Sequence, residues 1–282
     1  MRVLFAIGAG ERAGAAHVVW LHDSPATSVR STAVQLMMAL APHDAFVAPS
    51  AWMARTFRRR LGVRSHVIPH GVDVGTPRPV DVRRLLGWPD DGVVAHFGRL
   101  QRWKGAEDFL RAAAHVAPHR PEARFVLVGG ALFGLEVEYA KQLPALASQL
   151  GIADRVRFLG HRTDALSVMA GCDVVVHCSR RPEPFGMVVL EAMALGRAVV
   201  AAGEGAPPEM VRPGDTGLLA PPRRPIDLAA TLDEVIADPA LRARLGTAAA
   251  AEVAEQWTAD RMAERFAALY RGLRPAWLEE AS

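Results

Sequence analysis

Cysteine is scarce in this chain of 282 residues, which contains only Cys172 and Cys178. Two cysteines six positions apart, with no second pair and no His-x3-His, are too few for a disulfide framework and do not complete a zinc site. We therefore expect a reducing, cytoplasmic setting. The sequence also lacks any run of 18 apolar residues, and the apolar stretch before Gly8 is too short for a signal peptide. No membrane-spanning helix is expected.

Lysine is almost absent too, since Lys104 and Lys141 are the only two among 33 basic residues. With 30 acidic residues the net charge is only +3, and this scattered excess argues against a surface that follows nucleic-acid phosphates. The run Arg58-Arg59-Arg60 is interpreted as a solvated helix face. The alternative, an acidic lipid or sugar phosphate docking on these arginines, leaves peripheral membrane contact open. A hydrophobic fraction of 50% and a charged fraction of 22% are typical of a folded globular protein.

From Gly92 onward, short β-branched or aromatic runs alternate with longer helical patterns. This alternation is typical of βαβ units around a parallel sheet. Six strands in this order predict a complete doubly wound α/β domain. The expected strands are Val93–Phe97, Arg124–Val128, Val156–Leu159, Asp173–His177, Ala198–Ala201 and Thr216–Leu219.

The first 75 residues alternate in the same way but are short for a second lobe of this type. A Pro- and Gly-rich stretch, 69–79, predicts a linker, so we expect an abbreviated N-terminal lobe over 1–75 and a doubly wound domain over 76–256. Helices over 257–282 are expected to pack back on the N-terminal lobe through Met262, Phe266 and Leu269. If they do not, a homodimer through that lobe is the alternative. The N-terminal elements expected are strands Val3–Ile7, Val18–Leu21, Ala45–Ala48 and His66–Ile68, and helices Thr27–Leu40 and Ser50–Leu61.

The segment Arg181–Gly196 carries the most chemistry, because it follows a predicted strand and opens a predicted helix. Unpaired backbone N–H groups and the helix dipole at such a start bind anions. The N–H groups expected to face a phosphate are those of Gly186, Met187 and Val188. Glu183 lies in the preceding loop, and Glu191 lies in the helix where it can accept hydrogen bonds from the hydroxyls of a ribose.

A second loop, Gly98–Gly105, follows the first strand of the same domain. Arg99 offers a bidentate fork and Lys104 a compact charge, which together suit a diphosphate. Taken alone, two basic residues in a loop are more simply read as solvated. A third loop, Gly203–Glu209, is predicted to close the same crevice, although its prolines and glycines also fit ordinary turns.

These motifs together resemble the C-terminal half of retaining GT-B glycosyltransferases, the large family that includes bacterial glycogen synthases, sucrose synthases and mannosyltransferases (glycosyltransferase family 4-like). The resemblance covers Val67 to about Tyr270 and implies two Rossmann-type lobes. The motifs that carry it are Val67–Asp73, Gly98-Arg99 with Lys104-Gly105, Phe125–Gly129, Arg155–Gly160, Glu183-x7-Glu191 with Pro184-Phe185-Gly186, Pro208-Glu209 and Gly214–Leu219.

The resemblance implies a retaining, metal-independent transfer from a UDP-, GDP- or ADP-sugar to an unidentified hydroxyl acceptor, with no cofactor. It assigns donor-sugar hydroxyls to Glu183, the ribose to Glu191 and the diphosphate to Arg99 and Lys104. Phe185 and Gly160 enter the nucleotide site as members of their motifs. His22 resembles a histidine beside the donor sugar, although a strand-terminal histidine is more often merely hydrogen-bonded.

There are two alternatives to this function. The shortened N-terminal lobe allows a nucleotide-sugar binding module without efficient transfer. An NAD-linked Rossmann enzyme is disfavoured, because no Gly-x-Gly-x-x-Gly follows a strand with an acidic residue about 20 positions later.

Overall fold

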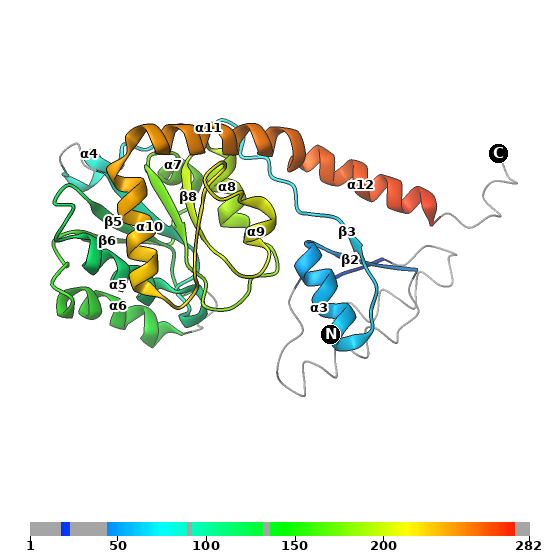
Figure 1. Ribbon diagram of the computed structural model, residues 1–282, viewed down its shortest axis with the longest axis horizontal. Helices are drawn as coiled ribbons and strands as arrows, with labels where there is room; N and C mark the ends of the chain where they lie inside the picture. The colour runs from blue at the N-terminus through cyan, green and yellow to red at the C-terminus, as the bar shows by residue number, and fades with distance from the viewer. Residues whose placement is uncertain (1–17, 23–43, 89–91, 132–135, 274–282) are drawn as a thin grey trace, which may run out of the picture. The chain divides into compact units, whose positions relative to one another are not determined.

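The structure is a computed structural model that describes residues 18–22, 44–88, 92–131 and 136–273. The chain divides into two compact units (Figure 1). Unit 1 comprises residues 1–71 and 257–282, and unit 2 comprises Val72–Gln256. The division after Gly71 falls inside the Pro- and Gly-rich segment. The strand Val3–Ile7 and the helix Thr27–Leu40 expected from the sequence lie outside the described residues.

Unit 2 is built on a six-stranded parallel sheet in the order β6-β5-β4-β7-β8-β9. This arrangement confirms the predicted doubly wound α/β sheet. Its strands are β4 (Val93–Phe97), β5 (Arg124–Val128), β6 (Val156–Gly160), β7 (Val174–His177), β8 (Ala198–Ala202) and β9 (Leu218–Ala220). Its helices are α4 (Val82–Leu86), η1 (Arg102–Lys104), α5 (Ala106–Val116), α6 (Val137–Gln149), α7 (Ala165–Ala170), α8 (Met187–Ala194), α9 (Pro207–Met210), α10 (Pro225–Ala237) and α11 (Pro239–Gln256).

Two helical layers enclose this sheet (Figure 1). Helix α10 packs on α5, which also contacts α6, whereas α11 packs on α8 and β8, and α8 contacts α7. The central strands are buried on both faces, as their Val-rich sequences require. The large buried side chains between sheet and helices include Phe109, Phe125, Leu143 and Leu232. The carboxyl ends of the parallel strands therefore meet at one edge of a rigid core, where ligands of such sheets bind.

Two local elements differ from the sequence expectation. The short helix α4 was not predicted; Asp81 accepts a hydrogen bond from the Arg84 backbone N–H at its start, and Gly87 ends it with a φ of 64°. The last strand begins at Leu218 rather than Thr216. The Thr216 hydroxyl accepts from the backbone N–H of Arg212 at 2.9 Å, which holds that residue in a turn.

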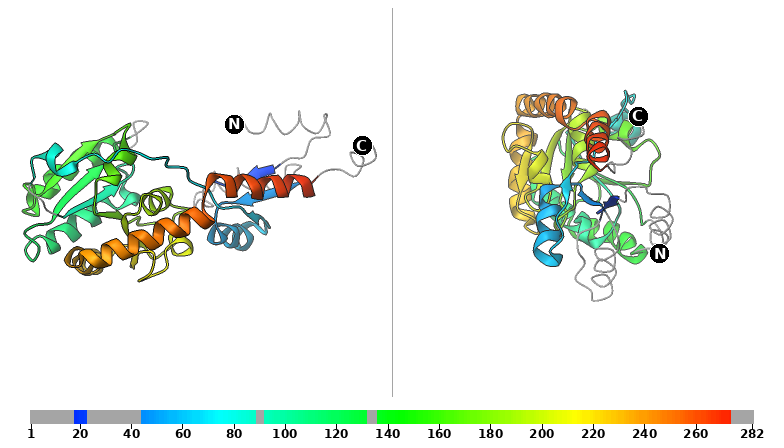
Figure 2. Two further views of the ribbon diagram at one scale, coloured as in Figure 1. Left: turned by 90° about the horizontal axis from the view of Figure 1, so that it is seen from above. Right: turned by 90° about the vertical axis from the view of Figure 1, so that its right-hand side faces the viewer.

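Unit 1 contains a three-stranded parallel sheet in the order β1-β2-β3. Its described elements are β1 (Val18–Trp20), β2 (Ala45–Ala48), α3 (Ala51–Leu61), β3 (His66–Val67) and α12 (Ala259–Gly272). Side chains alternate between the faces of a strand. Val19 joins the apolar cluster under α3 with Met53 and Phe57, whereas the Trp20 ring contacts Phe266 of α12 at 4.9 Å. The right-hand view of Figure 2 shows the strands between these two helices.

A close backbone approach joins α12 to the segment after β3. A Cβ atom on Gly71 would lie 2.2 Å from the carbonyl oxygen of Thr258, and the Gly71 N–H donates to the Met262 sulfur at 3.3 Å. Only glycine fits so close to another backbone. The segment after β3 and the first turn of α12 therefore pack together within unit 1.

Candidate functional site

Three loops meet at the carboxyl edge of the unit 2 sheet, following β4, β7 and β8. Glu183, in the loop after β7, forms a parallel bridge with Gly205, and its carbonyl oxygen accepts from Ala206 N–H at 3.0 Å. Gly205 has a φ of 86°, and a Cβ atom there would lie 2.5 Å from the Glu183 nitrogen. The backbone around Glu183 is thus fixed by its neighbouring loop.

The Glu183 side chain is the centre of a buried polar cluster. It is only 8% exposed, and its Oε1 is paired with the Lys104 ammonium from the loop after β4. Its Oε2 lies 2.5 Å from His177 Nε2 and accepts from the Ser179 hydroxyl at 2.8 Å. Burial opposes ionisation, but the His177 and Lys104 contacts outweigh it and hold the pKa of Glu183 well below its usual range. Glu183 is therefore a carboxylate at neutral pH.

Lys104 and Arg99 share the loop after β4, and both lie near Trp103. The Lys104 nitrogen is 4.3 Å from the Trp103 ring centre, and the Trp103 indole N–H donates to Gln101 at 3.0 Å. Arg99 is exposed, with its guanidinium carbon 5.9 Å from the same ring. The structure thus brings Lys104 to Glu183 and leaves Arg99 open to solvent on the same loop.

The loop containing Glu183 leads directly into α8. Gly186 caps this helix with a φ of 103°, and Phe185 before it is 4% exposed. The first N–H groups of an α-helix have no carbonyl partner within the helix, so Gly186, Met187 and Val188 offer donors at this end. Glu191 follows one turn later, half-buried, and burial raises its pKa. Glu183 and Glu191 thus differ in electrostatic environment, although both belong to one motif.

Two further predicted site residues belong to other elements of the described chain. Gly160 ends β6, with a φ of 65°, and its carbonyl accepts from the Gly129 N–H at 2.8 Å. His22 belongs to unit 1, where its ring lies 4.6 Å from Trp20 and stacks on His70 at 5.7 Å. Burial, followed by the charge of His22, lowers the pKa of His70.

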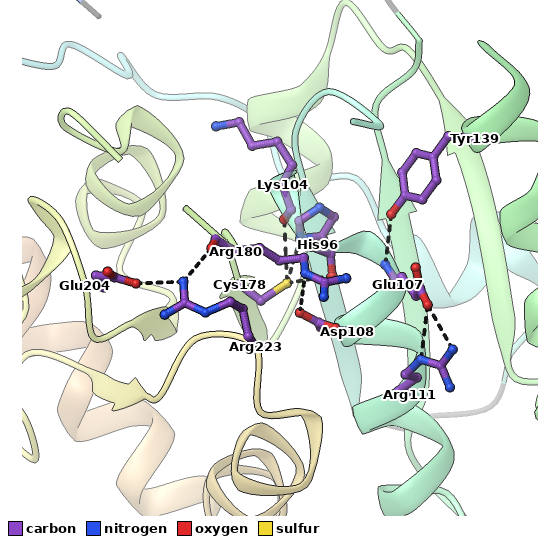
Figure 3. Close-up of polar contacts among 11 residues, drawn as sticks. His96, Lys104, Glu107, Asp108, Arg111, Tyr139, Cys178, Arg180, Glu204 and Arg223 are labelled. Carbon is purple, nitrogen blue, oxygen red and sulfur yellow. Dashed lines mark hydrogen bonds and ion pairs between the residues drawn. The ribbon is translucent and has the colours of Figure 1, made fainter. Parts of the chain in front are cut away.

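A second polar network lies beside the site (Figure 3). Arg223 donates to Glu204 Oε2 at 2.9 Å and to the Arg180 carbonyl oxygen at 2.5 Å, while Arg180 Nε lies 3.5 Å from Asp108. Burial raises the pKa of Asp108, although the positive charge of Arg180 acts to lower it. These contacts join the loops after β7, β8 and β9 to the first turn of α5. They stiffen the edge of the sheet that carries Glu183.

His177 and Ser179 complete the Glu183 cluster, and neither was expected at the site from the sequence. Both come from the end of β7, where an apolar run changes to polar residues. That change, at the carboxyl end of a central strand, was the available signal. This signal does not identify a site by itself, because the contacts of His177 and Ser179 with Glu183 depend on how the loop after β7 folds.

Neither a metal cluster nor a membrane span is found in the described part of the chain. Within 18–22, 44–88, 92–131 and 136–273, no group of three or more His, Cys, Asp or Glu side chains is placed to hold a metal ion. No helix within those ranges is both long and apolar enough to cross a bilayer.

Solved structures resemble this chain over almost its whole length. Anabaena Alr3699/HepE, in complex with UDP and glucose, is 32% identical with a TM-score of 0.87, covering 95% of this chain and 75% of that one. Sucrose-phosphate synthase from Thermosynechococcus elongatus is 28% identical with a TM-score of 0.80, covering 98% of this chain and 71% of that one. Both support the GT-B fold predicted from the motifs.

Curated relatives match over a smaller share of their own length. The D-inositol 3-phosphate glycosyltransferase of Stackebrandtia nassauensis is 40% identical over 193 residues, 65% of this chain and 43% of the relative. The protein of that name from Geodermatophilus obscurus is 36% identical over 267 residues, 84% of this chain and 58% of the relative. This chain spans about half the length of these relatives. The profile of the family described as glycosyl transferases group 1 matches residues 82–252, which contain the whole Glu183 cluster, and the chain belongs to that family.

Proposed function

We propose that this chain transfers a glycosyl group from a nucleoside-diphosphate sugar to an acceptor hydroxyl, with retention of anomeric configuration and without a metal ion. The observation that carries the proposal is the ionised, buried Glu183 paired with Lys104 beside the start of α8. A carboxylate accepts hydrogen bonds from sugar hydroxyls, and the cation and helix start next to it suit a phosphate.

Stabilisation of the leaving group supplies the catalysis in this scheme. Negative charge grows on the diphosphate as the glycosidic C–O bond breaks, and Lys104, Arg99 and the α8 N–H groups supply positive charge to meet it. Removing one preorganised donor of this kind typically costs about 3–4 kcal/mol of transition-state stabilisation. Because these groups neutralise the diphosphate, the scheme assigns no role to a metal ion. The departing phosphate accepts the proton of the acceptor, so no separate general base is assigned.

The two glutamates divide the donor between them. Glu183 is ionised and held by three side chains, so we assign it the hydroxyls of the transferred sugar. Glu191 lies one turn into α8, with a pKa raised by burial, and we assign it the vicinal hydroxyls of the ribose. His22 of unit 1 is assigned to the donor sugar on the strength of the motif resemblance alone.

The comparisons indicate which substrates to test first. Anabaena HepE has been solved with UDP-glucose as well as with UDP and glucose, which favours a UDP-sugar as donor. The relatives are named D-inositol 3-phosphate glycosyltransferases, which favours a phosphorylated polyol among the acceptors.

Thermal shift with UDP, GDP and ADP and with their glucose esters tests the donor site. A ligand at 100 times its Kd should add about 2.7 kcal/mol of stability. Arg99→Ala should weaken this response, whereas Arg111→Ala, an exposed arginine paired with Glu107 on α5, should leave it unchanged. No response to any nucleotide would overturn the proposal.

Product analysis then separates the enzyme from the binding module. Proton NMR of the glycosylated acceptor reports the anomeric configuration, and the same reaction with EDTA reports the need for a metal ion. If the protein binds the donor but neither transfers the sugar to inositol 3-phosphate nor hydrolyses the donor, the result would favour the binding module.

A further inference from the structure

His177 and Ser179 hold one oxygen of Glu183 from the end of β7. His177 is 5% exposed and Ser179 is 2% exposed. Both contact Oε2, at 2.5 Å and 2.8 Å, while Lys104 contacts Oε1 from a different loop. The carboxylate is therefore fixed at both oxygens, and its rotation about the last side-chain bond would break at least one of these contacts.

The backbone of β8 determines which nitrogen of His177 carries the proton. The Ala202 N–H points at His177 Nδ1 from a distance of 3.4 Å. A backbone N–H only donates, so Nδ1 is the acceptor and the ring proton lies on Nε2. Nε2–H therefore donates to Glu183, and the strand pairing of β7 with β8 supplies the orientation.

Cys178, between His177 and Ser179 in the sequence, fixes the end of β7 against the start of α5. The Cys178 thiol donates to the Gly105 carbonyl oxygen at 3.2 Å, and Figure 3 marks further contacts of the sulfur with His96 and the Lys104 carbonyl. A Cβ atom on Gly105 would lie 2.0 Å from the Cys178 carbonyl oxygen. Since successive side chains alternate between faces, Cys178 points away from the face shared by His177 and Ser179. The end of β7 and the start of α5 are thus locked together, with Lys104 at their junction.

We propose that His177 and Ser179 are positioning residues that orient the Glu183 carboxylate for the hydroxyls of the donor sugar. His177 acts as an Nε2–H donor whose orientation is set by the Ala202 N–H, and Ser179 is the second donor to the same oxygen. The identity of the sugar ligand rests on the proposed function, whereas the orientation of Glu183 is a property of the free protein. The two parts are tested separately.

Nitrogen-15 NMR of the histidine rings tests the orientation without any substrate. Comparison with His177→Gln assigns the His177 signals, and His115→Gln, an exposed histidine on α5, is the matched control. We expect the His177 ring to carry its proton on Nε2, and Glu183→Gln to move the Nε2–H signal while leaving that of His115 in place. A proton on Nδ1, or a His177 signal indifferent to Glu183→Gln, would overturn the proposal.

Binding and hydrolysis of the donor test the consequence for the sugar. His177→Phe removes the donor, whereas the amide nitrogen of His177→Gln can replace Nε2–H. We expect His177→Phe to bind UDP within twofold of the unaltered protein and to lose at least tenfold in kcat for UDP-glucose hydrolysis, with His177→Gln recovering most of the loss. Ser179→Ala should show a smaller loss of the same kind.

The outcomes separate a positioning role from a purely structural one. Equal losses in His177→Phe and His177→Gln, or a loss of UDP affinity as large as the loss in hydrolysis, would contradict positioning. If His177→Phe does not fold, Ser179→Ala and His177→Gln still decide the comparison. If the unaltered protein binds neither UDP, GDP or ADP nor their glucose esters, the proposed function fails while the NMR result stands.

Discussion

The Lys104–Glu183 pair gives a stability prediction that needs no ligand. The two side chains are 13% and 10% exposed, so both charges are largely withdrawn from water. Removing one partner of a buried ion pair costs about 3–5 kcal/mol, because the other charge stays buried without compensation. Glu183 keeps its contacts with His177 and Ser179. We therefore expect Lys104→Met to cost about 3 kcal/mol, at the lower end of this range.

The double variant Lys104→Met with Glu183→Gln provides the diagnostic comparison. It leaves no buried charge, and replacement of a whole buried pair by neutral groups is often close to neutral in stability. The double variant should therefore be more stable than Lys104→Met alone. Urea unfolding of all four proteins of the cycle measures this. Lys104→Met as stable as the unaltered protein, or a double variant that shows simple additivity, would refute the reasoning.

The pH dependence of the stability of the same proteins independently tests whether ionised Glu183 stabilises the folded state. The folded-state pKa of Glu183 lies below its ordinary value of 4.5. Its contribution to stability is thus present above pH 4.5 and is lost as pH falls through the lower folded value. Lys104→Met removes one of the contacts that lower this pKa, so its loss of stability on acidification should be smaller and should end at a higher pH. Glu183→Gln should abolish this part of the dependence.

Three further predictions concern the same edge of the sheet. Glu191→Gln should weaken UDP binding by about 1.5–3 kcal/mol in calorimetry, since a hydrogen bond to a charged group is worth that much; equal weakening by Glu183→Gln would contradict the division of roles. Gly205→Ala should lower the melting temperature, because its Cβ would lie 2.5 Å from the Glu183 nitrogen, whereas Gly214→Ala, also at positive φ but with open space around it, should cost less. The Cys178 thiol, whose pKa is raised by burial, should react with a thiol reagent only as fast as the protein unfolds.

The regular part of unit 2 could be predicted because its signals are local. Runs such as Val93–Phe97 and Val174–His177 are almost wholly apolar, which is typical of buried parallel strands. In the motif, Gly186 stands directly before the first residue of α8. The short helix α4 was not predicted, because five residues are too few to show a helical periodicity. Asp81 and Gly87, which cap it, are residue types that favour helix ends.

The Glu183 cluster could be predicted only in part. Glu183 and Lys104 stand in recognisable motifs, 79 positions apart in the chain, and each loop was assigned to the same crevice by its place after a parallel strand. His177 carried no comparable signal, because a histidine that ends an apolar strand looks like any core histidine. Its role depends on the Ala202 N–H and on the return of the loop to Glu183, and both are tertiary properties.

The charge balance of the Lys104–Glu183 pair determines what the proposed diphosphate site needs from other residues. Glu183 is ionised and Lys104 is its cationic partner, so this buried pair carries no net charge before a donor arrives. The negative charge of a diphosphate must then be met from outside this cluster, by the exposed Arg99 and by the dipole at the start of α8, worth about 0.3–1 kcal/mol at a surface. The ammonium of Lys104 has three N–H donors, so it can contact a phosphate oxygen while it keeps Glu183. The proposed function therefore assigns the orientation of the donor sugar to the buried pair, and the attraction of the phosphates to the exposed Arg99 and the start of α8.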